Sequence, residues 1–361
     1  MNSERDLPTE PPGLISRLIN YCRMVIEVSR ASDWWEYKLP VFLGVAYFIA
    51  YMANVSFSKL WILLPTLVLA VVSAASYVSV INDITDEQDD VAAGKSNRMV
   101  DRSTSFKVIS VSICIILGVI AAWLLATSWL TLSLFIANWI AYTAYSVRPL
   151  RLKKRGFTGV IADAGGGQLL PTLWTASFIF DHAPSTFNHS ILIPLGIWAG
   201  ALGIRGILTH QSIDLENDKK ANVRTLAVRI GVRKVRKLVT FLILPTEILA
   251  LLYLLTKAES SFVWTFFVLY LFFSWQMYKW LKIKLVAVLP SESFRFFLFK
   301  YYIAFFPASV ILSLATKNLL ALILLPLHAI MFPDSWKRFY SHFKAIKQRR
   351  YVFRDSKATT F

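Results

Sequence analysis

Charged residues are scarce in this sequence, at 17% of its 361 positions. Soluble domains usually carry about 25% charged residues. Hydrophobic residues make up 56% of the chain, and its mean hydropathy is +0.52. This composition excludes an ordinary soluble domain and predicts an integral membrane protein.

Cysteine is also rare, since the chain has only Cys22 and Cys114. Two distant cysteines provide neither a disulfide framework nor the paired spacing of a metal site. Residues 1–12 are polar, and no short apolar stretch with a cleavage site follows them, so we expect no signal peptide. Polar stretches long enough for a second domain are missing too, so we expect one integral domain.

Long apolar segments fill most of the chain. About 20 mostly apolar residues are needed for a helix to cross the hydrocarbon core of a membrane. By this rule the sequence predicts spans at 40–57, 60–81, 108–127, 129–147, 160–180, 191–209, 238–256, 262–280, 297–316 and 318–333. The predicted fold class is therefore all-α, a polytopic transmembrane helix bundle with nine or ten spans.

Lysine and arginine are distributed unevenly between these spans. They concentrate around 95–107, 148–155, 219–237 and 282–295, whereas the opposite loops are nearly bare. Because cytoplasmic loops carry the excess of basic residues, we expect these segments on the cytoplasmic side. Anionic lipid beside this face accounts for the net charge of +17, so we expect no nucleic acid partner.

Three regions follow from this pattern. Residues 1–37 are predicted to form a cytoplasmic tail, residues 38–333 the transmembrane domain, and residues 334–361 a basic cytoplasmic tail. In the first tail, apolar residues recur at helical spacing and predict an interfacial amphipathic helix. They are Leu14, Ile15, Leu18, Ile19, Cys22, Val25 and Ile26.

A dense group of carboxylates follows the second apolar span. The stretch INDITDEQDD, which begins at Ile81, has five carboxylates in ten residues. On a continuing helix, Asp83, Asp86 and Asp90 share one face. Three like charges on one face repel each other, so a divalent cation that prefers oxygen ligands would stabilise them. The alternative is a solvated charged segment that caps a membrane helix.

A second pair of carboxylates, Asp214 and Asp218, follows the sixth span at helical spacing and on the same predicted side. Two facing clusters could hold Mg²⁺ ions that also bind phosphate. Carboxylates alone would repel a diphosphate, whereas the metal ions reverse the sign of the interaction. Two unrelated solvated loops remain the alternative.

A basic loop lies between the two clusters. It reads YTAYSVRPLRLKKRG and follows the fourth span. Arginine and lysine suit phosphate oxygens, so Tyr145, Arg151 and Lys153 are candidate diphosphate contacts. The alternative is the basic anchor that most membrane proteins carry beside their spans.

Two further arginines are candidates for the same contact. Arg98 lies just after the first cluster, in the stretch AGKSNRMV. Arg205 lies in an otherwise apolar span, where an ionisable group is costly and therefore indicates a function.

With these motifs in place, the sequence resembles the UbiA superfamily of intramembrane prenyltransferases. Asn82, Asp83, Asp86 and Asp90 match its NDxxDxxxD signature, and Asp214 and Asp218 match its DxxxD signature. The loop YSVRPLRLK is similar to the family's Tyr-Ser-x-x-Pro-Leu-x-x-Lys pattern, and GKSNR is similar to its Gly-Lys-x-Asn-Arg stretch. The resemblance covers about residues 38–316, and Met99 replaces the proline usual after Asn-Arg.

The resemblance implies a UbiA-like fold and a Mg²⁺-dependent prenyltransferase. It implies that the five aspartates are the metal ligands and that, with Asn82, they form the catalytic set. The basic residues would bind the diphosphate of a prenyl donor. The allylic C–O bond then ionises, and an acceptor attacks the carbocation. The acceptor stays open among an aromatic acid or quinone precursor, a tetrapyrrole, a phospho-sugar and a glyceryl lipid.

The rival interpretation is a cation-coupled transporter that uses the same carboxylates. The acidic residues, however, crowd at one predicted membrane face, and no pair of Gly/Pro-interrupted helices marks a site at the midplane. We therefore expect a multi-pass enzyme of the cell or inner membrane, surrounded by membrane lipids, with its active site on the cytoplasmic side.

Overall fold

The structure is a computed structural model that describes residues 14–92, 94–183, 189–220, 223–288 and 295–358. The polar segment 1–12, on which the expectation about a signal peptide depends, lies outside the described residues. So do residues 359–361 of the predicted C-terminal tail.

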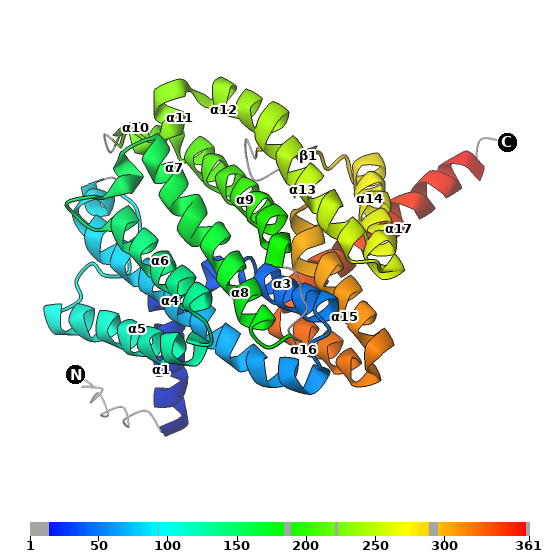
Figure 1. Cartoon of the computed structure of the whole chain (residues 1–361). Coiled ribbons are helices and arrows are strands. Elements are labelled where there is room, and N and C mark those ends of the chain that lie inside the picture. The colour runs from blue at the N-terminus through cyan, green and yellow to red at the C-terminus, as the bar shows by residue number, and fades with distance from the viewer. Residues whose placement is uncertain (1–13, 93, 184–188, 221–222, 289–294, 359–361) are drawn as a thin grey trace, which may run out of the picture.

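The described chain is almost entirely helical (Figure 1). Its first half forms α1 (Leu14–Val28), α2 (Ala31–Trp34), α3 (Leu39–Met52), α4 (Phe57–Ala92), α5 (Thr104–Leu125), α6 (Trp129–Ser146), α7 (Phe157–Ala164) and α8 (Leu170–Phe180). Its second half forms α9 (Leu192–Ile213), α10 (Leu215–Lys220), α11 (Leu226–Ile230), α12 (Val232–Leu238), α13 (Leu244–Lys257), α14 (Ser261–Leu281), α15 (Phe306–Lys317), α16 (Leu324–Met331) and α17 (Pro333–Ala358). The predicted all-α class is confirmed. A short parallel pair of strands, β1 (Leu285–Val286) and β2 (Arg295–Phe296), joins α14 to the segment before α15.

Three wide π-helical turns interrupt the α-helical geometry without ending the helix. Gly165–Leu169 joins α7 to α8, Val239–Ile243 joins α12 to α13, and Tyr301–Phe305 leads into α15. Such a turn changes the direction in which the following side chains point, and it is frequent at functional sites. The first one lies inside the bundle, beside α6 and α9.

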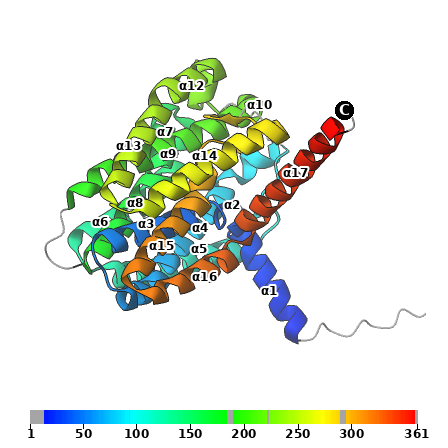
Figure 2. The same cartoon turned by 90° about the vertical axis from the view of Figure 1, so that its right-hand side faces the viewer.

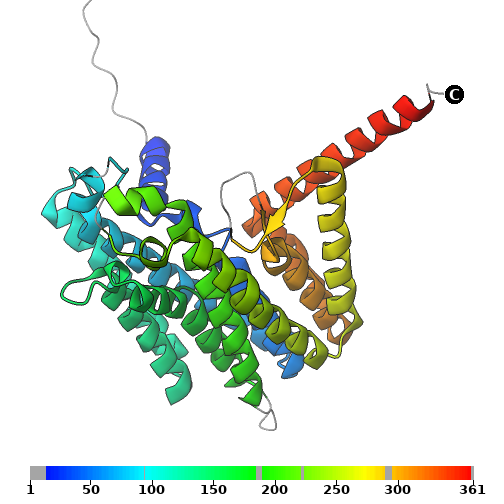
Figure 3. The same cartoon turned by 90° about the horizontal axis from the view of Figure 1, so that it is seen from above.

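The long helices lie side by side in a bundle (Figures 1 and 3). Neighbouring pairs include α4 with α5, α9 with α13, and α6 with α8, while α3 packs between α8 and α15. The helices α14 and α15 stand on the side of the bundle opposite α5 and α6. Large rings such as Phe48, Trp174 and Tyr301 are fully buried in the core.

Among the described residues, five helical stretches are long and apolar enough to cross a membrane: 57–92, 104–125, 189–213, 232–257 and 261–281. A sixth is reached if the bent pair 319–331 and 333–349 counts as one span, although its two parts meet at 83°. All ten predicted apolar segments coincide with helical structure in the described residues, but several of these helices are short. The number of nine or ten membrane crossings therefore stays a prediction.

The first and last described helices project from the bundle (Figure 2). In α1, the apolar side chains of Ile19, Val25 and Ile26 are exposed, which agrees with the predicted amphipathic helix. Its place at the membrane interface stays a prediction. The basic helix α17 packs against α14 through Phe339 and Ile346, and its C-terminal part extends away from the bundle.

Candidate functional site

The first aspartate cluster lies on the last turns of α4, which continues past its apolar part without a break. Asp83 is buried, with 3% of its surface exposed, and its Oδ1 accepts a hydrogen bond from Arg30 Nη1 at 3.2 Å. Arg98 Nη1 lies 3.8 Å from the other carboxylate oxygen, Oδ2. Asn97 Nδ2 donates to Asp90 Oδ2 at 2.8 Å and so ties the following loop to the helix. The expected helical face of carboxylates is present.

The second cluster begins where α9 ends. The backbone N–H of Asp218 donates to the carbonyl of Asp214 at 2.8 Å, so the helical spacing of the two residues persists into α10. Lys95 Nζ lies 3.7 Å from Asp214 Oδ2 and connects the loop after the first cluster to the second cluster. Thr225 donates to Asp218 Oδ2 at 3.1 Å. Burial raises the pKa of Asp218, and the Thr225 hydrogen bond opposes this shift.

The basic loop after α6 binds the same aspartate face. Arg151 Nη2 and Lys153 Nζ each donate to a different oxygen of Asp86 at 2.6 Å. Arg151 also donates to Asp89 at 2.8 Å, and Lys153 donates to Asn82 Oδ1 at 2.6 Å. Burial lowers the pKa of the Lys153 ammonium group, while Asp86 opposes the shift. Positive charges are thus held directly over the carboxylates.

A cavity of about 560 Å³ separates the two clusters. All five predicted metal-binding aspartates line it, and so do Asn82, Arg98, Tyr145 and Lys153. Arg151 does not line it, although its guanidinium group binds Asp86 in the cavity wall. The structure therefore brings together residues from three distant parts of the sequence, on α4, on the loop after α6 and around α10.

The described residues contain no group of three or more His, Cys, Asp or Glu side chains already arranged around a metal position. Asp83, Asp86 and Asp214 face lysine or arginine instead, whereas Asp90 and Asp218 accept hydrogen bonds from Asn97 and Thr225. Two observations nevertheless fit a hard divalent cation. The acidic groups at the cavity offer oxygen ligands, which Mg²⁺ prefers. In addition, Asp83 Oδ2 is buried and accepts no hydrogen bond.

A second cavity of about 290 Å³ lies inside the bundle. It shares Arg30, Asn82, Tyr145, Ile207 and His210 with the first cavity. Its remaining wall combines apolar and aromatic side chains, such as Phe42 and Trp174, with the ionisable groups of Lys38 and Asp163. The polar cavity between the aspartates therefore borders a more apolar chamber.

Arg205 is not brought to the cavity between the aspartates. Its guanidinium Nε and Nη2 donate to the two oxygens of Glu247 on α13, each at 2.5 Å, and both side chains are fully buried. The Phe296 ring lies 3.7 Å from the guanidinium carbon. The sequence predicted a diphosphate contact for Arg205, and the structure places this residue in an ion pair inside the bundle, away from the lining of that cavity.

Sequence reasoning missed several residues at the two cavities. Arg30 follows α1, in the left-handed backbone conformation (φ 53°), and reaches Asp83 from 53 positions away. Lys154 binds Asp89 at 2.6 Å. Asp163 lies inside the predicted span 160–180, and an acidic residue within a span is a signal that the sequence did offer. The part that Arg30 plays at the site is visible only from its contact with Asp83 in the folded chain.

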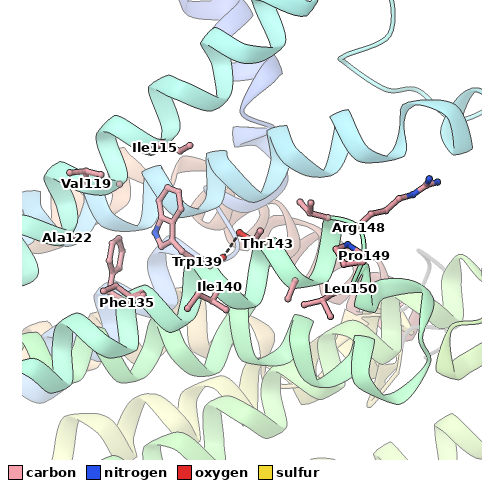
Figure 4. A pocket seen from close by; sticks show the side chains of 14 residues that line it. Ile115, Val119, Ala122, Phe135, Trp139, Ile140, Thr143, Arg148, Pro149 and Leu150 are labelled. Carbon is pink, nitrogen blue, oxygen red and sulfur yellow. Dashed lines mark hydrogen bonds between the residues drawn. The ribbon is translucent and has the colours of Figure 1, made fainter.

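An apolar groove of about 510 Å³ lies elsewhere, between α5 and α6 (Figure 4). Trp139 lies in its centre and stacks on Tyr77 with ring centroids 4.6 Å apart. Arg148 lies at one end and is the one charged side chain among the described residues of the wall, so none of these lining residues is acidic.

Comparison with known proteins gives a consistent result. Residues 39–287 match the model of the UbiA prenyltransferase family. No curated protein sequence matches the chain.

Solved structures with a similar fold include a UbiA homolog from Archaeoglobus fulgidus, bound to DMAPP and Mg²⁺ (16% identity, TM-score 0.55) or to GPP and Mg²⁺ (16%, 0.54). Each alignment covers 81% of this chain and 99% of the other. A structure of digeranylgeranylglyceryl phosphate synthase aligns at 17% identity with a TM-score of 0.54, covering 82% of this chain and 99% of the other.

Proposed function

Because the chain belongs to the UbiA prenyltransferase family, we propose that it is an integral membrane enzyme that transfers a prenyl group from a prenyl diphosphate to a lipophilic or aromatic acceptor. The observation that carries this proposal is the cavity of about 560 Å³ in which two aspartate clusters face each other, with lysine and arginine between them. Transport of a cation would not need this number of positive groups beside the carboxylates.

The balance of charge in the cavity suits a diphosphate. Five cations line it, and each lies 2.6–3.8 Å from a carboxylate oxygen of the aspartate clusters: Arg30, Lys95, Arg98, Lys153 and Lys154. A diphosphate would be an alternative partner for these cations. Each carboxylate that loses its cation would then need another positive partner.

Asp83, Asp86, Asp90, Asp214 and Asp218 would hold Mg²⁺ in that state, and the UbiA homolog complexes with DMAPP and GPP contain the same ion. Bound Mg²⁺ would offset the negative charge that develops on the departing diphosphate. Asn82, which accepts hydrogen bonds from Ser146 and Lys153, would orient the donor beside the basic loop.

The inner cavity would hold the reacting carbon. The allylic C–O bond of the donor breaks, and its electron pair leaves with the diphosphate. The resulting cation would be shielded from water by apolar walls, and the faces of rings such as Phe42 and Trp174 would stabilise its positive charge. The acceptor's nucleophilic atom would then form the new bond to that carbon and release its proton to the solvent.

The first test measures binding of geranylgeranyl diphosphate, and release of diphosphate from it, by the purified protein with and without Mg²⁺. A pooled extract of membrane lipids and aromatic compounds supplies the acceptor. We expect both signals to require Mg²⁺. Asp83→Asn and Asp214→Asn should each lower diphosphate release by more than about 100-fold, because they remove charge that acts on the transition state.

Asp334→Asn is the matched control, since Asp334 is exposed at the start of α17, away from both cavities. It should leave release unchanged. If the wild-type protein neither binds nor cleaves geranyl, geranylgeranyl or longer prenyl diphosphates, the proposal fails, and a cation transporter becomes the better interpretation of the aspartates.

A further inference from the structure

Two opposite charges converge inside the bundle without touching each other. Lys38 lies at the start of α3, and Asp163 lies in α7, just before the wide turn Gly165–Leu169. A Cβ atom placed on Gly167 would lie 3.7 Å from Lys38 Nζ and 3.8 Å from Asp163 Oδ1. The glycine leaves the space between the two head groups open. Both residues line the inner cavity.

Lys38 is held by the backbone of the wide turn, since its Nζ donates to the carbonyl oxygen of Gly167 at 3.0 Å. Asp163 lies close to Tyr145 and His210, which line the same cavity. Among the described residues, Lys38 and Asp163 do not form an ion pair with each other. An ammonium and a carboxylate therefore lie on two sides of one polar opening.

Such an arrangement is costly in a lipid-embedded bundle unless a polar group completes it. A hydroxyl group fits both sides, because its hydrogen is donated to a carboxylate and its oxygen accepts from an ammonium. We propose that Lys38 and Asp163 form the acceptor subsite and bind a hydroxyl group of the acceptor. This inference names the acceptor class and rests on the proposed prenyltransferase function.

The position of the subsite supports this role. Tyr145 lines both cavities. An acceptor hydroxyl bound at Asp163 would therefore lie next to the cavity between the aspartates, where the diphosphate is proposed to bind. The rings of Phe42, Tyr142 and Trp174 line the same inner cavity and offer flat apolar surfaces to an aromatic acceptor. A negatively charged group would be repelled by Asp163, and an ether would have no hydrogen to donate to it.

The test compares a hydroxyl probe with its ether. Binding of 2-naphthol and of 2-methoxynaphthalene to the full-length protein in detergent is measured by calorimetry, and 1-O-octadecylglycerol represents an aliphatic alcohol. We expect 2-naphthol to bind about tenfold or more tightly than its methyl ether, because a hydrogen bond to a buried charged group is strong. Asp163→Asn and Lys38→Met should each remove that preference.

Binding of geranylgeranyl diphosphate in Mg²⁺ is measured for every variant. If the Asp163→Asn variant still binds geranylgeranyl diphosphate, the variant is folded. If the wild-type protein does not bind geranylgeranyl diphosphate, the result contradicts the proposed function and not the acceptor subsite. Asp181→Asn is the control for the same change at a distance, since Asp181 binds Thr127 and Ser128 outside both cavities. It should keep the naphthol preference.

The outcomes separate clearly. If the protein prefers 2-naphthol over its methyl ether and loses this preference in Asp163→Asn, the acceptor is aromatic. If only the binding of 1-O-octadecylglycerol is weakened in Asp163→Asn, the subsite binds an aliphatic alcohol. Equal binding of 2-naphthol and its ether, together with indifference of the glycerol probe to Asp163→Asn, would overturn the proposal.

Discussion

Opposing influences set the acid-base behaviour of Asp218. Burial raises the pKa of its carboxyl group most, and the neighbouring Asp214 carboxylate raises it further, whereas the hydrogen bond from Thr225 and the charge of Lys95 lower it by smaller amounts. The group therefore takes up a proton at a higher pH than an exposed aspartate, whose pKa is about 3.9. We predict that Mg²⁺-dependent diphosphate release falls as the pH drops through this raised pKa, because a protonated carboxyl group binds cations poorly. Additional Mg²⁺ should move the fall to lower pH.

Thr225→Val removes the opposing hydrogen bond and should shift the acid side of the pH profile to higher pH. Thr225→Ser keeps the hydroxyl group and should leave the profile in place. An identical profile for wild type and Thr225→Val would show that Asp218 does not control the acid side.

Arg205 and Glu247 show what an isolated charge would cost in this core. Both are fully buried, and Tyr302 also donates to Glu247 at 2.7 Å. Removing one partner of a buried ion pair costs about 3–5 kcal/mol, because the other charge remains without compensation. Arg205→Met should therefore lower the free energy of unfolding by that amount, measured by denaturant titration in detergent.

The double variant Arg205→Met with Glu247→Leu should recover most of this stability, since no buried charge is left. Binding of geranylgeranyl diphosphate should be unchanged in the double variant. If the double variant regains its stability but no longer binds geranylgeranyl diphosphate, Arg205 would be assigned to the diphosphate site.

Single residues were predictable where a motif repeats at helical spacing. The aspartates lie where the sequence placed them because the spacing itself defines the helical face. Arg30 and Lys38 carry no such spacing, since each is a single basic residue beside a helix end. Arg30 meets Asp83 of α4, and Lys38 meets Gly167 in the turn between α7 and α8, and hydropathy encodes neither contact.

The contact between α7 and α9 determines where Asp163 lies. A Cβ atom at Gly203 of α9 would lie 2.9 Å from the carbonyl oxygen of Ala164 and 3.0 Å from its Cα. These are backbone atoms, so they cannot rotate away. We predict that Gly203→Ala destabilises the protein by about 1–3 kcal/mol through overpacking. It should also weaken binding of 2-naphthol, because it displaces the residue next to Asp163.

Gly200→Ala is the matched control on the same helix, since nothing lies within 4 Å of its added Cβ. It should be neutral or slightly stabilising in the same unfolding measurement. Equal free energies of unfolding for the two variants would mean that α7 and α9 can move apart without a loss of stability.

The length of the apolar segments predicted where the helices lie. It did not predict where α4 ends or where the helix within residues 160–180 is interrupted. The second predicted span ends at 81, whereas α4 continues to Ala92, because hydropathy falls where charges begin while the backbone hydrogen bonds continue. The predicted span 160–180 contains the wide turn Gly165–Leu169, which begins with three consecutive glycines and is not marked by a change in hydropathy.

The whole molecule has two chemically different ends. The loops that follow α4, α6 and α9 border the cavity between the aspartates, and they are rich in lysine and arginine. At the other end, Thr127 and Ser128 bind Asp181, and Lys317 binds Asn54. We propose that the basic end faces the cytoplasm, in line with the distribution of lysine and arginine.

Labelling with a membrane-impermeant maleimide tests this orientation. The background variant is Cys22→Ser, because Cys22 is exposed whereas Cys114 is buried. Lys237→Cys should react only after the cells are opened, and Ala126→Cys should react on intact cells. The reverse pattern would place the aspartates on the outer side.

The two cavities meet at only a few lining residues of the described chain, among them Tyr145 and His210. Most of the inner wall can therefore change by mutation without altering a group that lines the charged chamber. Natural selection can in this way exchange the acceptor while the reaction with the diphosphate stays the same. A scaffold divided in this manner can diversify into enzymes for many products from one ancestral chemistry.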